Sequence, residues 1–143
     1  MRLTRHTDNA LRLLTFLALD PEHAVPAGEI ARRMRMSEDH LVKVIGRLAA
    51  LGYVETRRGR MGGVRLAVAA SKVRVGQVVR ETEDNLALVE CFNPETNQCP
   101  IAPACALATA LDRALSAFLA VLDDLTLADL AAHPRQLARL IPD

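Results

Sequence analysis

Residues 37–66, SEDHLVKVIGRLAALGYVETRRGRMGGVRL, decide the fold that we predict. Ser37 is a typical helix N-cap, and the two acidic residues after it suit the positive end of a helix dipole. Gly52 is typical of a helix end. The alternation from Tyr53 to Arg57 predicts a strand, and residues 64–66 predict a second strand, so this stretch ends in a two-stranded hairpin. The apolar residues at helical spacing before Gly52 are Leu41, Val42, Val44, Ile45, Leu48 and Leu51.

Two further helices are predicted upstream of this stretch. Residues 3–19 carry Leu13, Leu14 and Leu17 at helical spacing, and Asp20-Pro21 supplies a stop. A short second helix around Ile30 ends near Met36. Two helices joined by a tight turn form a helix-turn-helix, and the hairpin that follows is typical of a wing. The predicted fold class is therefore mainly α, a winged helix-turn-helix with a two-stranded wing.

The helix that begins after Ser37 and the wing together predict a DNA-binding surface. Small or polar side chains in the first turns of a recognition helix can reach base edges, while the apolar side holds the helix on the domain. Arginines mounted between glycines let the hairpin approach phosphates or a narrow minor groove. For the helix, the alternative is an ordinary solvated face. The candidate DNA contacts are Ser37, Glu38, His40, Lys43, Arg47, Arg57, Arg58 and Arg60.

The charge is divided unevenly along the chain, although the formal net charge is only +1. Residues 1–65 contain 12 Lys and Arg against 7 Asp and Glu, and the remainder contains 6 against 10. The basic part coincides with the predicted helix-turn-helix and wing, where a nucleic acid would bind.

A long apolar helix is predicted near the C-terminal end. After a short helix over residues 73–83, residues 103–122 carry one continuous apolar stripe. Such a stripe needs a partner, and pairing with a second copy would give a dimer that matches a two-fold symmetric DNA site. The alternative is packing against its own domain. Thr126 is a typical cap for one last short helix. The residues of the stripe are Leu107, Leu111, Leu115, Phe118 and Leu122.

The chain has three cysteines, Cys91, Cys99 and Cys105, all in the segment between these two helices. Their spacing contains no CxxC pair of the kind that structural zinc sites commonly use, although zinc is not excluded. Three thiolates on an irregular loop are typical ligands of an iron-sulfur cluster. Three unligated thiols are the remaining alternative.

Four features together resemble the family of dimeric winged-helix iron-sulfur repressors that includes the regulators NsrR and IscR. They are LTRHTDNALR at residues 3–12, HLVKVI at 40–45, RGRMGGVRL at 58–66, and the three cysteines in order. The resemblance extends from one end of the chain to the other.

The resemblance implies a cluster held by Cys91, Cys99 and Cys105, 4Fe-4S or alternatively 2Fe-2S. In NsrR-like members with a 4Fe-4S cluster, the fourth ligand is an aspartate in the first helix of the other subunit, which corresponds to Asp8. Its alternative role is an ordinary helix acid paired with Arg12. IscR-like members have a histidine three residues after the last cysteine, and this chain has Ala108 there. The gap between the first two cysteines is also longer than is usual in the family.

The implied function is that of a homodimeric repressor that binds a double-stranded inverted-repeat operator and loses affinity for it when nitric oxide attacks the cluster. One alternative is an IscR-like regulator of cluster supply or redox stress. Another, from a different class, is an iron-sulfur electron carrier or delivery protein. An enzyme is not expected, because no nucleophile motif is recognisable and the wing glycines do not form a phosphate-binding loop.

The expected organisation has three parts. Residues 1–84 are predicted to form the winged helix-turn-helix domain, residues 85–102 the cysteine loop, and residues 103–143 the dimerisation helix and tail. We expect a cytoplasmic protein with no membrane partner, because the chain lacks a signal peptide and an apolar run of about 20 residues. The odd cysteine count also argues against a secreted disulfide framework.

Overall fold

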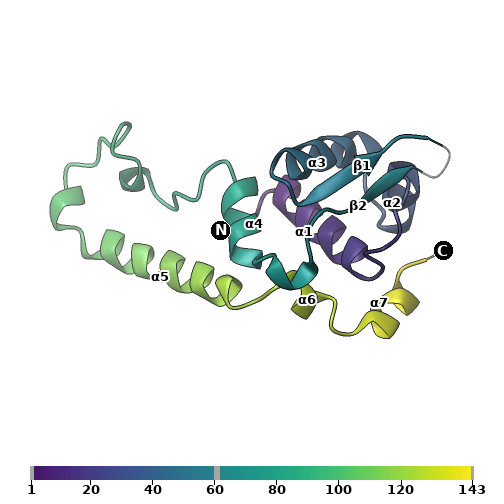
Figure 1. Ribbon diagram of the computed structural model, residues 1–143. Coiled ribbons are helices and arrows are strands. Elements are labelled where there is room, and N and C mark those ends of the chain that lie inside the picture. The colour runs from purple at the N-terminus through teal and green to yellow at the C-terminus, as the bar shows by residue number, and fades with distance from the viewer. Residues whose placement is uncertain (1, 60–61, 143) are drawn as a thin grey trace.

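The computed structural model describes residues 2–59 and 62–142. Figure 1 shows a group of helices with a two-stranded hairpin, from which the long helix α5 and an irregular loop extend. The hairpin pairs β1 with β2 in antiparallel order, and Val54 faces Leu66. This is the winged helix-turn-helix that the sequence predicts. Its elements are α1 (Arg5–Ala18), α2 (Ala27–Arg33), α3 (Glu38–Ala50), β1 (Val54–Arg57) and β2 (Gly63–Leu66).

An aliphatic core holds the three helices together. Leu13 and Leu14 of α1, Ile30 of α2, and Leu41 and Leu48 of α3 are all 0% exposed. These are the residues whose helical spacing predicted the elements. Truncating any one of them to alanine typically costs about 2–5 kcal/mol of stability.

The turn between α2 and α3 is tight and is held from α1. Arg35 has a φ of 51°, and the Met36 amide donates to the Ala31 carbonyl over 2.8 Å. The Arg12 guanidinium of α1 donates to the Met34 carbonyl over 2.5 Å. The second helix ends at Arg33, a little before the predicted Met36. The left-handed backbone at Arg35 ends it, because helical residues need negative φ.

The wing is fastened to the loop between α1 and α2. Val25 and Val64 form a β-bridge, with N–H to O distances of 3.0 Å and 2.9 Å. A Cβ added at Gly63 would lie 2.5 Å from the Val25 carbonyl oxygen, so glycine permits this close approach. The wing and the helix-turn-helix therefore form one packed unit.

Helix α4 (Val75–Thr82) connects this unit to α5 (Ala106–Asp123). Arg80 of α4 forms a bidentate ion pair with Asp123 of α5, and both N–O distances are 2.6 Å. A Cβ at Gly76 would lie 2.9 Å from the Asp123 backbone nitrogen, so the two helices touch at a glycine. The long helix begins at Ala106, after the predicted Pro103, because residues 102–104 form a separate 3₁₀ turn, η3 (Ala102–Ala104).

The chain returns to the helix-turn-helix after α5. Thr126 caps α6 (Leu127–Leu130) with a capping box to Asp129, as its position in the sequence indicates. A further helix, α7 (Pro134–Leu140), was not predicted. It lies beside α1 and α2, and the Arg33 guanidinium donates to the Pro142 carbonyl over 3.0 Å. No helix within the described residues has both the length and the apolar character to cross a membrane.

Candidate nucleic-acid interface and cysteine loop

One face of α3 is buried, and the opposite face carries the predicted DNA contacts. Leu41, Val44, Ile45 and Leu48 are buried against the core. Val42 is 56% exposed, so its expected place on the apolar side is wrong. It lies on the solvent side because, at roughly 100° of rotation per residue, it is about 110° from the centre of the face formed by Leu41, Val44, Ile45 and Leu48. The predicted contacts on α3 and its N-cap are all exposed: Ser37, Glu38, His40, Lys43 and Arg47.

The wing presents arginines beside this helix. Arg57 and Arg58 are exposed. Glu55 accepts from Arg65 over 2.5 Å and from Arg57 over 3.3 Å. The hydrogen bond from Arg65 is the largest cause that holds the pKa of Glu55 below its usual range. Arg57 is thus partly neutralised, whereas no ion pair within residues 2–59 and 62–142 engages Arg58.

The loop of the wing turns at a glycine. Gly59 has a φ of 105°, a conformation that residues with a side chain rarely adopt. The Gly62 amide donates to the Gly59 carbonyl over 2.9 Å and closes the turn. Arg60, which we predicted to contact DNA, lies outside the described residues.

The three cysteines lie on the segment between α4 and α5. Cys91 lies in the short turn η2 (Glu90–Phe92), Cys99 follows in irregular backbone, and Cys105 is the N-cap of α5. All three are free and partly buried. The amide groups at a helix N-terminus favour negative charge, which suits a thiolate at Cys105.

Local hydrogen bonds connect the cysteine-bearing segments. The Glu90 carboxylate accepts from the backbone N–H of Gln98 over 2.8 Å, which brings the chain beside Cys91 close to the chain beside Cys99. The Cys99 carbonyl accepts from the Ala102 amide over 3.3 Å. Among the described residues, however, no three His, Cys, Asp or Glu side chains converge to hold a metal ion.

The donor set nevertheless fits an iron-sulfur cluster in its chemistry. Three free thiols on one short segment are the soft ligands that iron-sulfur clusters use. Most of the segment has irregular backbone or short 3₁₀ turns, so no long helix or strand holds the thiols apart. The fourth position would need a ligand from elsewhere.

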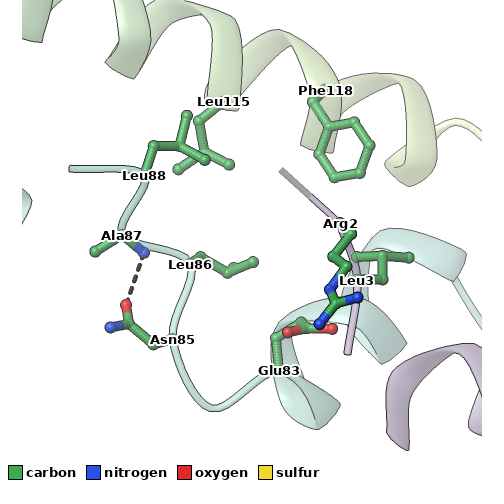
Figure 2. Close-up of a pocket in the computed structure, with 9 residues that line it drawn as sticks. All are labelled: Arg2, Leu3, Glu83, Asn85, Leu86, Ala87, Leu88, Leu115 and Phe118. Carbon is green, nitrogen blue, oxygen red and sulfur yellow. Dashed lines mark hydrogen bonds between the residues drawn. The ribbon is translucent and has the colours of Figure 1, made fainter. Parts of the chain in front are cut away.

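The start of the cysteine loop is anchored on α5 by apolar side chains. Figure 2 shows Leu88 beside Leu115, while Leu86 points into a pocket that Phe118 also lines. The pocket has a volume of about 200 Å³. Asn85 accepts from the Ala87 amide over 2.7 Å and fixes the turn that leads into the loop.

Asp8 lies in the first turn of α1, and its side chain is 60% exposed. The Asp8 carboxylate is 3.8 Å from the Arg12 guanidinium. The ion pair with Arg12, which the sequence analysis named as the alternative role of Asp8, is therefore present. Exposed pairs at this distance contribute little to stability. The carboxylate remains accessible to a second chain.

Glu83 joins the start of α1 to the end of α4. Its carboxylate accepts from the Thr4 amide over 2.7 Å and from the Thr4 hydroxyl over 3.0 Å. Partial burial raises the pKa of Glu83, but hydrogen bonds from Thr7 and Thr4 outweigh it and hold the pKa below its usual range. This contact could not be predicted from the sequence, because the partners are 79 residues apart.

The fold and the three thiols define a winged-helix regulator with a cysteine-bearing loop. Residues 3–133 match the Rrf2 family, described as an iron-dependent transcriptional regulator. The chain belongs to this family. It is a transcriptional regulator that binds DNA and not an enzyme, so the electron-carrier alternative no longer stands.

Two similar proteins, each from a different bacterium, align with nearly the whole chain. The HTH-type transcriptional regulator NsrR of Geobacillus kaustophilus (strain HTA426) is 49% identical over 144 residues, which is 100% of this chain and 98% of that protein. NsrR of Bacillus subtilis (strain 168) is 46% identical over 142 residues, which is 99% of this chain and 97% of that protein.

Solved structures support the same fold. The oxidised form of Staphylococcus aureus CymR has a TM-score of 0.73 and 26% identity, covering 92% of this chain and 96% of its own. T. potens IscR has a TM-score of 0.77 and 23% identity, covering 96% of this chain and 90% of its own. The likeness to IscR shows the fold alone.

Proposed function

We propose that this chain is a homodimeric repressor whose affinity for DNA depends on an iron-sulfur cluster that senses nitric oxide. The observation that carries the proposal is the position of three free, partly buried cysteines on one loop between the DNA-binding unit and the long apolar helix α5. The full-length likeness to NsrR regulators supports it. The absence of a histidine at position 108 favours this proposal over an IscR-like regulator.

Cys91, Cys99 and Cys105 would hold the cluster, and Asp8 of the partner subunit would supply the fourth ligand. When bound, the cluster supplies iron that nitric oxide can attack. A carboxylate binds iron less tightly than a thiolate, so Asp8 would be the most readily displaced of the four ligands. Because Asp8 lies on the DNA-binding unit and the thiols lie on the loop, this ligand set would connect the two.

The DNA-binding surface would consist of the exposed face of α3 and the wing. Ser37, Glu38 and His40 would face base edges at the start of α3. Lys43 and the wing residues Arg57, Arg58 and Arg60 would contact bases or phosphates. Two copies of α3 held by paired α5 helices would match an inverted repeat.

A non-denaturing mass spectrum of protein purified without oxygen tests this proposal. We expect a dimer that carries one 4Fe-4S cluster per subunit and loses or nitrosylates it when nitric oxide is added. The Cys99→Ala variant should give a dimer without a cluster. A wild-type dimer that carries zinc, or no metal, would contradict the sensor and leave the three cysteines as a structural site or a thiol switch.

A further inference from the structure

The last turn of α4 is bonded to both DNA-binding elements through one residue, Glu81. The Arg47 guanidinium, at the end of α3, donates to the Glu81 carbonyl with N–O distances of 2.7 Å and 3.2 Å. The Tyr53 hydroxyl, directly before β1, donates to the Glu81 carboxylate. One residue of α4 therefore meets the end of the recognition helix and the root of the wing.

The hydrogen bond from Tyr53 to Glu81 can hold the start of the wing in a fixed position on α4. The Tyr53 side chain belongs to the hydrophobic core and is only 6% exposed, so its ring has little freedom to move. Burial, followed by the hydrogen bond to Glu81, raises the pKa of Tyr53 above its usual value, so the phenol stays protonated and remains a donor. A hydrogen bond to a charged acceptor is about twice as strong as one between neutral groups.

Glu81 lies only a few residues before the cysteine loop. Helix α4 ends at Thr82, and residue 85 already belongs to the turn that leads into the cysteine loop. A displacement of that loop therefore reaches Glu81 within a few residues of the same backbone. Arg80, next to Glu81, is bonded to Asp123 of α5, so the same turn also meets the long helix.

We propose that Glu81 is a positioning residue that holds α3 and the wing in a fixed arrangement on α4. The proposal rests on the DNA-binding function proposed above. It also gives Arg47 a role different from the one predicted, because its guanidinium acts on Glu81 and not on DNA. We call the contacts of Glu81 with Arg47 and Tyr53 the brace. Through the brace, a displacement of the end of α4 would move α3 and the wing together.

The test compares variants of the full chain that each remove one part of the brace. Tyr53→Phe removes the donor and keeps the ring, Glu81→Gln keeps the size of the acceptor, and Arg47→Met removes the guanidinium. Glu22→Gln, an exposed glutamate in the α1–α2 loop, is the matched control for charge. The probe is the duplex that wild-type protein selects from a random-sequence library, and affinity is measured over a range of salt concentrations.

We expect Tyr53→Phe and Arg47→Met to lower affinity for the selected duplex roughly fivefold to tenfold, with an unchanged salt slope. Glu81→Gln should lower it by less, and combining it with Tyr53→Phe should add little, because both changes weaken the same bond. Glu22→Gln should bind as wild type does. Wild-type affinity in both Tyr53→Phe and Glu81→Gln would overturn the proposal. So would a salt slope reduced by about 1 in Arg47→Met, since that marks a phosphate contact.

Amide hydrogen exchange keeps the proposal testable without DNA or when one variant does not fold. We expect Arg47→Met to accelerate exchange in the last turn of α3 and Tyr53→Phe to accelerate it in β1, and both to leave α6 unchanged. Unchanged exchange in α3 and β1 would overturn the brace. If wild-type protein selects no duplex, the proposed function fails, whereas the exchange measurement still decides whether Glu81 holds these elements.

Discussion

At the scale of single residues, Asp8 offers the sharpest test of the ligand set. Replacing Asp8 with alanine removes the only ligand that we assign to the partner subunit, so the cluster should be lost about tenfold faster or more. The decay of cluster absorbance under chelator measures this rate. Asp20→Ala is the control, because Asp20 is exposed and bonded to His23. Equal rates for Asp8→Ala and wild type would show that another group completes the site.

Glu83 predicts a pH dependence of stability. Its pKa is lowered in the folded state from an ordinary 4.5, so its contribution is present above that value and is lost as the pH falls through the lowered value. Glu83→Gln should therefore cost stability at pH 7 and progressively less as the solution is made acidic. Urea unfolding at a series of pH values measures this. If the free energies of unfolding of the variant and the wild type differed by the same amount at every pH, the Thr4 contact would not depend on the charge of Glu83.

We predict that the wing arginines affect the salt dependence of DNA binding and not its sequence specificity. Arg60→Ala should weaken binding to all duplexes and lower the salt slope by about 1, because a phosphate contact releases counterions regardless of sequence. Arg58→Ala should behave in the same way. Binding titrations at several salt concentrations give the slope. An unchanged slope and affinity would remove the arginine concerned from the interface.

At the scale of elements, two helical glycines should respond in opposite directions to the same change. Gly76→Ala places a Cβ 2.9 Å from the backbone of Asp123, so α4 and α5 must separate, at a cost of about 1–3 kcal/mol. A Cβ at Gly46 in α3 meets nothing within 4 Å, so Gly46→Ala should stabilise the chain by about 0.5–1 kcal/mol. Denaturant unfolding of both variants measures this. Equal effects would contradict the close crossing of α4 and α5.

The sequence predicted elements well where periodicity is strong and contacts are local. Residues 3–19 predicted α1 (Arg5–Ala18), and the residues after Ser37 predicted α3, because each helix buries one continuous apolar face. It did not predict α7, a short helix whose residues are not fully buried and whose contacts are with α1 and α2.

The candidate site was predicted by residue type but not by arrangement. The sequence indicates three soft ligands and a basic helix and wing. It contains nothing that brings Arg47 and Tyr53 to Glu81, or Val25 to Val64, because those contacts exist only once the helices have packed. In the same way, the spacing of the cysteines does not show how the folded chain arranges them.

At the scale of the whole molecule, the apolar stripe of α5 predicts a dimer. Figure 1 shows α5 extending away from the winged helix-turn-helix. None of its residues is buried, and Leu107 is 64% exposed. Leu107→Arg should therefore give a monomer by placing a charge in the paired surface. Sedimentation equilibrium measures this, with Asp112→Arg as control on an exposed position of the same helix. A dimeric Leu107→Arg variant would place the subunit contact elsewhere.

Packing of this stripe on its own domain is the alternative to a dimer. In the described part of the chain, the contacts of α5 with other helices are mainly those with α4 near Asp123. The chain's own loop partly covers Leu115 and Phe118, while Leu107 at the start of the stripe stays exposed. A second copy would cover it and would also bring a second Asp8 and a second recognition helix into the assembly.

Control of DNA binding by the cluster can be tested on one oxygen-free preparation. Affinity for the selected duplex is measured before nitric oxide is added, after it is added, and again after the cluster is removed. We predict tight binding by the loaded dimer and a loss of affinity of at least about tenfold in both other states, which corresponds to roughly 1.4 kcal/mol of differential binding. Equal affinity in all three states would show that the cluster does not control binding to DNA.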